Sequence, residues 1–235
     1  MPVIPDLRVS VTLEDVTRSW GPQRARLVSP RMIARVSELL ERIEAEHWLQ
    51  PKMSYRFWPV AGIGPEGIEL MDGARLHAPL ASDYLRDATQ IGVGVCTLGA
   101  TLEKHVGEWF ESRDRLRGVL LDEIGSLALY QLSDRLEERM QEEAALQGLD
   151  ISGVLNPGDE GFDLSSDGLI LDLSGGADIG LSVTILGMLK PQKSISLVVG
   201  LGKDMRKWNR AERCERCKMR LHCPNRQFLT EDVPI

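Results

Sequence analysis

Apolar residues recur at helical spacing in the first part of the chain. Across residues 32–43 they lie three or four positions apart, and Ser29 followed by Pro30 suits a helix start, because serine caps helices and proline is tolerated in their first turn. Further helices are expected at residues 82–88, 100–111, 114–147 and 164–173. Within the longest of them, Gly125-Ser126 indicates either close packing or a break.

Shorter apolar runs bounded by turn residues predict β-strands. Residues 53–60 and 68–71 flank a segment rich in glycine with one proline, so they are expected to form a hairpin. Residues 91–97 form an apolar run that Gly92 and Gly94 weaken as a strand. Two more strands are expected at residues 179–184 and 194–200.

The helical and strand signals are unevenly distributed along the chain. The first 149 residues are mainly helical in pattern and acidic, whereas residues 150–202 hold ten glycines and two prolines. We therefore predict an α+β protein. Residues 1–202 would form one domain, with a helical first part and a glycine-rich sheet as its second part, and residues 203–235 would form a cysteine-rich tail.

Composition and charge narrow the class of protein. The chain has 235 residues, 43% of them hydrophobic, which is ordinary for a globular protein. No apolar run approaches the ~20 residues that span a bilayer, and the first residues lack the pattern of a signal peptide, so a cytoplasmic protein without a membrane partner is expected. The net charge is −7, but residues 203–226 carry +6, and an acidic body with one short basic segment argues against a nucleic-acid partner.

Three of the four cysteines lie within ten residues of one another. They are Cys214, Cys217 and Cys223, in the stretch CERCKMRLHCPNR. A C-x-x-C pair places two sulfurs on one metal ion, and a third thiol follows closely. The surrounding arginine and lysine side chains favour thiolates, and they balance the negative charge of a thiolate-bound centre. Dense cysteines in a reducing compartment more often bind metal than stay free, so this triplet is expected to hold a metal.

Two kinds of metal centre fit the cysteine triplet. Zinc needs four ligands, and His222 offers the fourth, although its neighbour Cys223 would have to turn toward the same ion. A [4Fe–4S] cluster also takes cysteine ligands, and a proline after the last cysteine is familiar from ferredoxins. The fourth iron ligand would then be the distant Cys96, His222 or none. For Cys96 itself, burial as a small hydrophobic residue at the end of an apolar strand is the simpler interpretation.

The second half of the chain resembles a known family. The stretches that carry the resemblance are NPGDEGFDLSSDG, IGLSVTILGMLKPQKSISLVVGLG and, upstream, VCTLGATLEKHV and LLDEIGSLALYQLSDRL. They are similar, in this order, to the activation domain of cobalamin-dependent methionine synthase and more closely to stand-alone forms with a C-terminal cysteine cluster, over about residues 75–226. The resemblance implies a C-shaped α+β fold with a curved antiparallel sheet and flanking helices. It also implies binding of S-adenosylmethionine and docking onto a cobalamin domain whose cobalt(II) is reduced and methylated.

Part of the family's ligand-binding motif is retained. Pro157-Gly158 matches its Pro-Gly, whereas Asp159 stands in place of its tyrosine and Val154 lies near the position of its arginine. The two glycines of the segment allow close backbone approach, and its acidic residues suit ribose hydroxyls. The cofactor-binding candidates are Pro157, Gly158, Asp159, Glu160, Gly161 and Thr184. A tight turn without a ligand is the alternative interpretation of the same segment.

The function that these features predict is reductive reactivation of a corrinoid protein. A cysteine-ligated [4Fe–4S] cluster would supply the electron, an electron donor such as a ferredoxin would reload it, and S-adenosylmethionine is a candidate methyl donor. Two alternatives stay open: an adaptor that binds a corrinoid protein through a zinc knuckle, and a small-molecule-binding protein with a pocket in the glycine-rich half. The sequence lacks the P-loop, G-x-S-x-G and H-E-x-x-H motifs.

Overall fold

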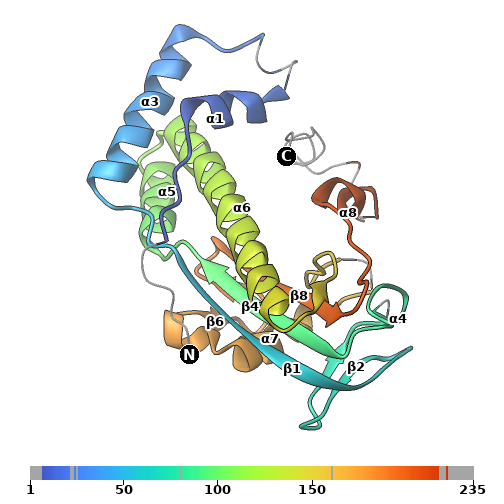
Figure 1. Cartoon of the computed structure of the whole chain (residues 1–235). Helices are drawn as coiled ribbons and strands as arrows, with labels where there is room; N and C mark the ends of the chain where they lie inside the picture. The colour runs from blue at the N-terminus through green and yellow to red at the C-terminus, as the bar shows by residue number, and fades with distance from the viewer. Residues whose placement is uncertain are drawn as a thin grey trace.

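The computed structural model describes residues 7–21, 24, 26–79, 81–159, 161–216 and 221. A curled antiparallel sheet of six strands lies at the centre of this part of the chain, in the order β3-β2-β1-β4-β8-β5 (Figure 1). Its strands are β1 (Lys52–Gly64), β2 (Gly67–Leu70), β3 (Arg75–His77), β4 (Gln90–Thr97), β5 (Asp150–Ile151) and β8 (Ser194–Gly202). A separate small hairpin pairs β6 (Ser182–Val183) with β7 (Leu189–Lys190).

Helices pack on the sheet and, at one end of the longest helix, on one another. They are α1 (Leu13–Ser19), α3 (Pro30–Ala45), α4 (Ala81–Tyr84), α5 (Thr101–Glu111), α6 (Arg115–Leu146), α7 (Asp167–Ser174) and α8 (Arg210–Arg216), with 3-10 turns η1 (Leu164–Ser166) and η2 (Gly176–Ile179). Local sequence sets their starts: Ser29 accepts a hydrogen bond from the Met32 amide ahead of α3, and Asp114 accepts one from the Arg117 amide in α6. Among the described helices, none combines the length and apolar character that crossing a bilayer requires.

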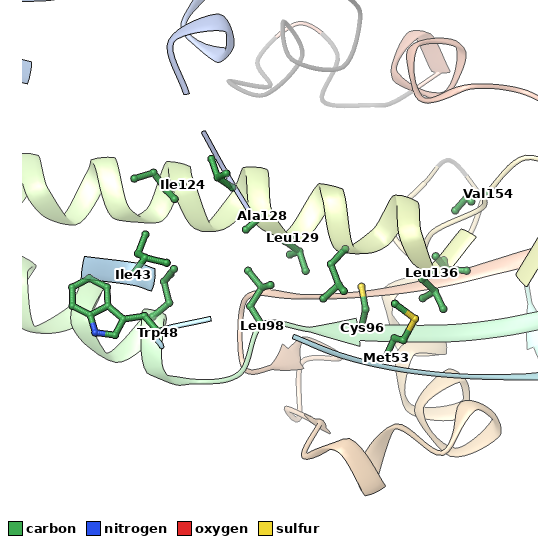
Figure 2. Close-up of a cluster of buried hydrophobic side chains, with 14 of the residues drawn as sticks. Ile43, Trp48, Met53, Cys96, Leu98, Ile124, Ala128, Leu129, Leu136 and Val154 are labelled. Carbon is green, nitrogen blue, oxygen red and sulfur yellow. The ribbon is translucent and has the colours of Figure 1, made fainter. Parts of the chain in front are cut away.

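The long helix α6 lies across one face of β4 and β8, and two glycines let it approach. Side chains alternate along β4, so Gly92, Gly94 and Cys96 face α6 while the valines between them face away. A methyl group on Gly92 would lie 2.4 Å from Cε of Met140, and one on Gly94 would lie 3.1 Å from Cδ2 of Leu136. Figure 2 shows Leu136 and Cys96 in the resulting core. The two glycines, which disfavour a strand by residue type, therefore allow the helix to pack closely on it.

The opposite face of the sheet is covered by α7 and the turns around it. Ile170 and Leu173 of α7 pack with Val93 and Val95 of β4 and Val198 of β8 in a second hydrophobic cluster. Two hydrogen bonds, one buried and one partly buried, fix this layer: the Ser54 hydroxyl donates to the Ser174 carbonyl (2.6 Å) and Trp58 Nε1 donates to the Leu173 carbonyl (3.1 Å). The sheet is thus buried on both faces around β4 and β8.

The outer edge of β8 is only partly paired, which creates room for a site. The short strand β5 pairs with Leu201 and Gly202 alone, and a single bridge joins Leu155 to Val198. Further toward the start of β8, the Asn156 side chain donates from Nδ2 to the Ser196 carbonyl (2.6 Å) in place of a neighbouring strand. Beyond this point the edge of β8 opens toward the β6–β7 hairpin and α8.

Most predicted elements are confirmed, including the β1–β2 hairpin, the strands at 91–97 and 194–200 and the long helix. Two expectations are corrected. Four of the six strands of the main sheet precede residue 100, so the sheet is not confined to the glycine-rich second part. Residues 179–184 do not form a strand throughout, because η2 and the left-handed Gly180 leave only β6. Of the two alternatives for Gly125-Ser126, close packing is the one observed: α6 continues through both residues, and Gly125 lies against the Leu102 side chain.

Candidate ligand cavity

A cavity of about 800 Å³ lies at the open edge of β8. Its walls come from six segments: the start of β8, the turn after β5, the η1 turn with the start of α7, the β6–β7 hairpin, the outer side of α6 and helix α8. Ligand pockets for small molecules usually measure ~300–1,000 Å³, so this cavity has the size for a nucleoside-sized ligand. Apolar side chains form much of its lining, namely Leu164, Ile185, Leu186, Met188, Leu189 and Ile195.

Several residues singled out in the sequence meet at this cavity. Pro157, Asp159 and Thr184 line it, and so does Cys214, 30 positions beyond Thr184 in sequence. Gly158 does not line it but shapes the turn through its positive φ of 95°. Glu160 lies outside the described residues. The role of these side chains as ligand contacts stays a prediction.

The segment around Pro157 is a compact turn held by its own hydrogen bonds. The Asn156 amide donates to Oδ2 of Asp159 (2.9 Å), and the Asp159 amide donates back to the Asn156 carbonyl (2.9 Å). The Gly158 amide donates to the Phe162 carbonyl (2.8 Å), and Gly161 takes a left-handed φ of 70°. The segment is therefore a tight turn, and the same turn forms one wall of the cavity. The two interpretations given by the sequence are compatible.

A buried acid forms part of the cavity wall. Asp167, at the start of α7, is 4% exposed, and its Oδ1 accepts a hydrogen bond from the Ser196 hydroxyl of β8. Burial raises the pKa of the Asp167 carboxyl above its usual value, and the Ser196 hydrogen bond offsets this in part. Both residues line the cavity. The Asn156 side chain, bonded to the Ser196 carbonyl, connects this pair to the turn at Pro157.

Helix α8 covers another side of the cavity and is fixed by two arginines. Arg210 forms an ion pair with Asp134 of α6 and lies over the Tyr130 ring, 5.0 Å from its centroid. Arg213 donates from Nη1 to Oδ1 of Asn156. Cys214 follows directly and is half-buried. The first cysteine of the triplet is thus held at the cavity by contacts to α6 and to the turn.

The metal site itself lies largely outside the described part of the chain. Cys217, Cys223 and His222 are not described, and no group of three or more potential metal-ligating side chains occurs among the residues that are. Cys96 is fully buried in the core under α6, and burial raises the pKa of its thiol to about 12 (Figure 2). This confirms the interpretation of Cys96 as a core residue, and a thiol in that state is a poor metal ligand.

The fold is a curled antiparallel sheet with flanking helices, and it has a solved counterpart. The crystal structure of the MetH reactivation domain bound to AdoHcy is similar, with a TM-score of 0.56 over 91% of this chain and 86% of that chain. The sequence identity is 15%, so the likeness is one of fold. No protein-family model matches the chain, and no curated protein sequence matches it.

Four features of the cavity were not predicted from the sequence: Tyr130, Asn156, Asp167 and the contact of Arg213 with Asn156. Asp167 looks like an ordinary acidic residue in the first turn of a helix, where negative charge is common. Tyr130 lies in the middle of a long helix whose apolar stripe faces elsewhere. The packing of α6, α7, α8 and the turn after β5 around the start of β8 brings these residues together, and no local pattern encodes that packing.

Proposed function

We propose that this protein binds S-adenosylmethionine in the cavity at the edge of β8 and takes part in reactivating a corrinoid protein. The observation that carries the proposal is the meeting of Pro157, Asp159, Thr184 and Cys214 at one cavity. The first three are the residues expected to contact the nucleoside, and the fourth begins the cysteine triplet. The fold likeness to a MetH reactivation domain bound to AdoHcy supports the same proposal.

The donor set of the cavity suits S-adenosylmethionine. Apolar side chains such as Leu164 and Met188 offer surface for an adenine ring, and the half-buried Asp159 offers a carboxylate to ribose hydroxyls. Arg213 and Lys190 are basic groups on the lining that suit the carboxylate of the amino-acid end. When bound, the ligand supplies a methyl group. The residues of the chain would hold it in place and exclude water from the part of the cavity wall where Asp167 is buried.

We also propose that Cys214, Cys217 and Cys223 hold a [4Fe–4S] cluster. A cluster of this kind supplies single electrons at potentials as low as about −700 mV, which suits the reduction of cobalt(II) to cobalt(I) in a corrinoid partner. Cys214 is half-buried on the cavity wall, and Arg210 and Arg213 precede it on the same helix. Positive charge beside it favours the thiolate that binds iron. A ferredoxin-like protein would provide the electrons.

The apolar tip of the β6–β7 hairpin is a suitable contact for the corrinoid partner. Ile185 is fully exposed and Leu186 is 81% exposed. The tip is ordered by its own hydrogen bonds, since the Thr184 amide donates to the Met188 carbonyl (2.8 Å) and the Met188 amide donates to the Thr184 hydroxyl (3.1 Å). Exposed apolar side chains gathered in one place commonly mark a protein interface.

Two measurements on anaerobically purified protein test the proposal. Iron and acid-labile sulfide in near-equal amounts, lost in Cys214→Ala and kept in Cys96→Ala, are expected for the cluster. One zinc per chain without iron would replace the electron-transfer role with that of a zinc-knuckle adaptor. Calorimetric titration with S-adenosylmethionine is expected to show binding, and absence of heat at millimolar ligand would remove the methyl-donor role.

A further inference from the structure

The acidic side chains around the cavity differ in how their charge is compensated. Asp134 forms an ion pair with Arg210, and Asp159 accepts a hydrogen bond from the Asn156 amide. Asp167 is far more buried than either, yet its Oδ1 accepts only the neutral Ser196 hydroxyl. No basic side chain of the described residues lowers its pKa. Burial of an unpaired carboxylate is unfavourable unless a partner arrives, so Asp167 stands out.

The second carboxylate oxygen of Asp167, Oδ2, makes no hydrogen bond to a described residue. Oδ2 is not a fully buried atom that lacks a partner. Among the described residues, the one such side-chain nitrogen or oxygen is Nε of Arg117. Oδ2 is thus neither fully buried nor hydrogen-bonded, and Asp167 lines the cavity, so we expect this oxygen to face the cavity. It is therefore available to a ligand.

We infer that Asp167 makes the cavity selective for a positively charged ligand, so that S-adenosylmethionine binds more tightly than its demethylated product AdoHcy. This inference rests on the proposed function. The two ligands share the nucleoside and the amino-acid end, and they differ in the sulfur, which is a cationic sulfonium in the first and a neutral thioether in the second. Attraction between unit charges ~4 Å apart is strong in a partly buried site, and a tenfold preference needs only about 1.4 kcal/mol of it.

The preference would have a use in the proposed cycle. Cobalt(I) of the corrinoid partner would supply the electron pair for the new carbon–cobalt bond, while the carbon–sulfur bond breaks and its electron pair stays on sulfur. The ligand therefore loses its positive charge in that step. The carboxylate of Asp167 then faces a neutral sulfur and loses the attraction. Product release is favoured by the same residue that favours binding of the methyl donor.

Calorimetric titrations of both ligands into the wild-type protein and Asp167→Asn, at pH about 8, test the inference. The wild-type protein is expected to bind S-adenosylmethionine at least about tenfold more tightly than AdoHcy. In Asp167→Asn, which keeps the shape of the side chain, the preference is expected to vanish because the affinity for S-adenosylmethionine alone falls. Asp172→Asn, on the exposed side of the same helix, removes an equal charge and is expected to keep the preference.

The outcomes separate the two proposals. Equal affinities in the wild-type protein, or a preference that survives in Asp167→Asn, would overturn the role of Asp167 and leave ligand binding intact. If neither ligand binds to the wild-type protein, the proposed function fails and the selectivity fails with it. If Asp167→Asn does not fold, as judged by circular dichroism, Ser196→Ala serves instead. Loss of the hydroxyl donor disfavours the charged carboxylate, so the preference is expected to shrink several-fold, and an unchanged preference would contradict the inference.

Discussion

The two sides of helix α6 perform different tasks. Toward the sheet, Leu132, Leu136 and Met140 are completely buried and pack on the glycine pair of β4 and on β8. The other side carries Tyr130 and Asp134 at a spacing of four, and both contact Arg210 of α8. One side therefore holds the fold together without polar groups, and the other builds a cavity wall from polar groups in contact with a basic helix. The contrast shows how one helix separates stability from recognition.

The largest expected difference is in the reactivity of the two described cysteines, since Cys96 lies in the core on the sheet side of α6 and Cys214 lies on α8 at the cavity. At pH about 8 a thiol with a pKa of about 12 is ionised in roughly one molecule in ten thousand, whereas an ordinary thiol is ionised in a substantial fraction. After metal removal by a chelator under reducing conditions, we expect iodoacetamide to alkylate Cys214 more than about a thousandfold faster than Cys96. Peptide mass spectrometry over time measures both rates. Comparable rates in the folded protein would show that the core around Cys96 opens readily.

Shortening a side chain on the sheet side should affect stability most. Leu136→Ala removes a buried side chain between α6 and β4 and leaves a cavity, so we expect a loss of about 3 kcal/mol in the free energy of unfolding. Leu116→Ala in the same helix is the control, since that side chain is 41% exposed and its change should stay within about 0.5 kcal/mol. Urea denaturation measures both. A similar loss in the two variants would contradict the distinction between the sides.

The attachment of α8 depends on a hydrogen bond that can be removed alone. Arg213→Ala eliminates the charged donor to Oδ1 of Asn156, and we expect the opening free energy of α8 to fall by about 1 kcal/mol while the sheet is unaffected. Hydrogen exchange of α8 amides relative to those of β4 is the measurement. Lys203→Ala, at an exposed basic residue, is the matched control and should leave both unchanged. Equal protection of α8 in all three proteins would count against the role of Arg213.

The smallest effect is expected from the acidic cluster on the cavity side. Burial, and then Asp134, raise the pKa of Glu137, while Arg210 and Arg213 act in the opposite direction. A carboxyl whose pKa is raised by folding favours the folded state fully only below its ordinary pKa, and that contribution is lost as the pH rises through the raised value. Glu137→Gln should therefore be more stable than the wild-type protein near neutral pH, by about half a kcal/mol, and show no gain below pH about 4. A gain that persists at low pH would exclude a charge effect.

The sequence predicted the parts of the fold that local patterns encode. The β1–β2 hairpin, the strand around Cys96 and the helix after Asp114 follow from apolar spacing and from the turn residues that bound the strands. It failed at residues 179–184, where apolar character suggested a strand but Gly180 adopts a left-handed conformation that ends the 3-10 turn. The expected division into a helical and a sheet-forming half was wrong, because pairing of β4 with β8 joins segments about a hundred residues apart.

The candidate site was predicted in part for the same reason. Pro157, Asp159 and Thr184 were reached through a family resemblance, and the structure brings them to one cavity with Cys214. Asp167 could not be singled out, because its distinguishing property is burial next to Ser196 without a basic partner, and that property exists only after α7 has packed on β8. Tertiary contacts, and not residue type, give it its chemistry.

The glycine pair of β4 has a consequence beyond packing. Helix α6 packs directly on the backbone of β4 at Gly92 and Gly94. Any larger residue at these positions would move α6 away from the sheet, and Tyr130 and Ser133 on the cavity wall would move with it. The distance between α6 and the sheet therefore also sets one dimension of the cavity in which the ligand is expected. Mutations that change the distance between α6 and the sheet should also change the size of the cavity. Proteins of this fold that differ at the two glycine positions should therefore also differ in ligand preference.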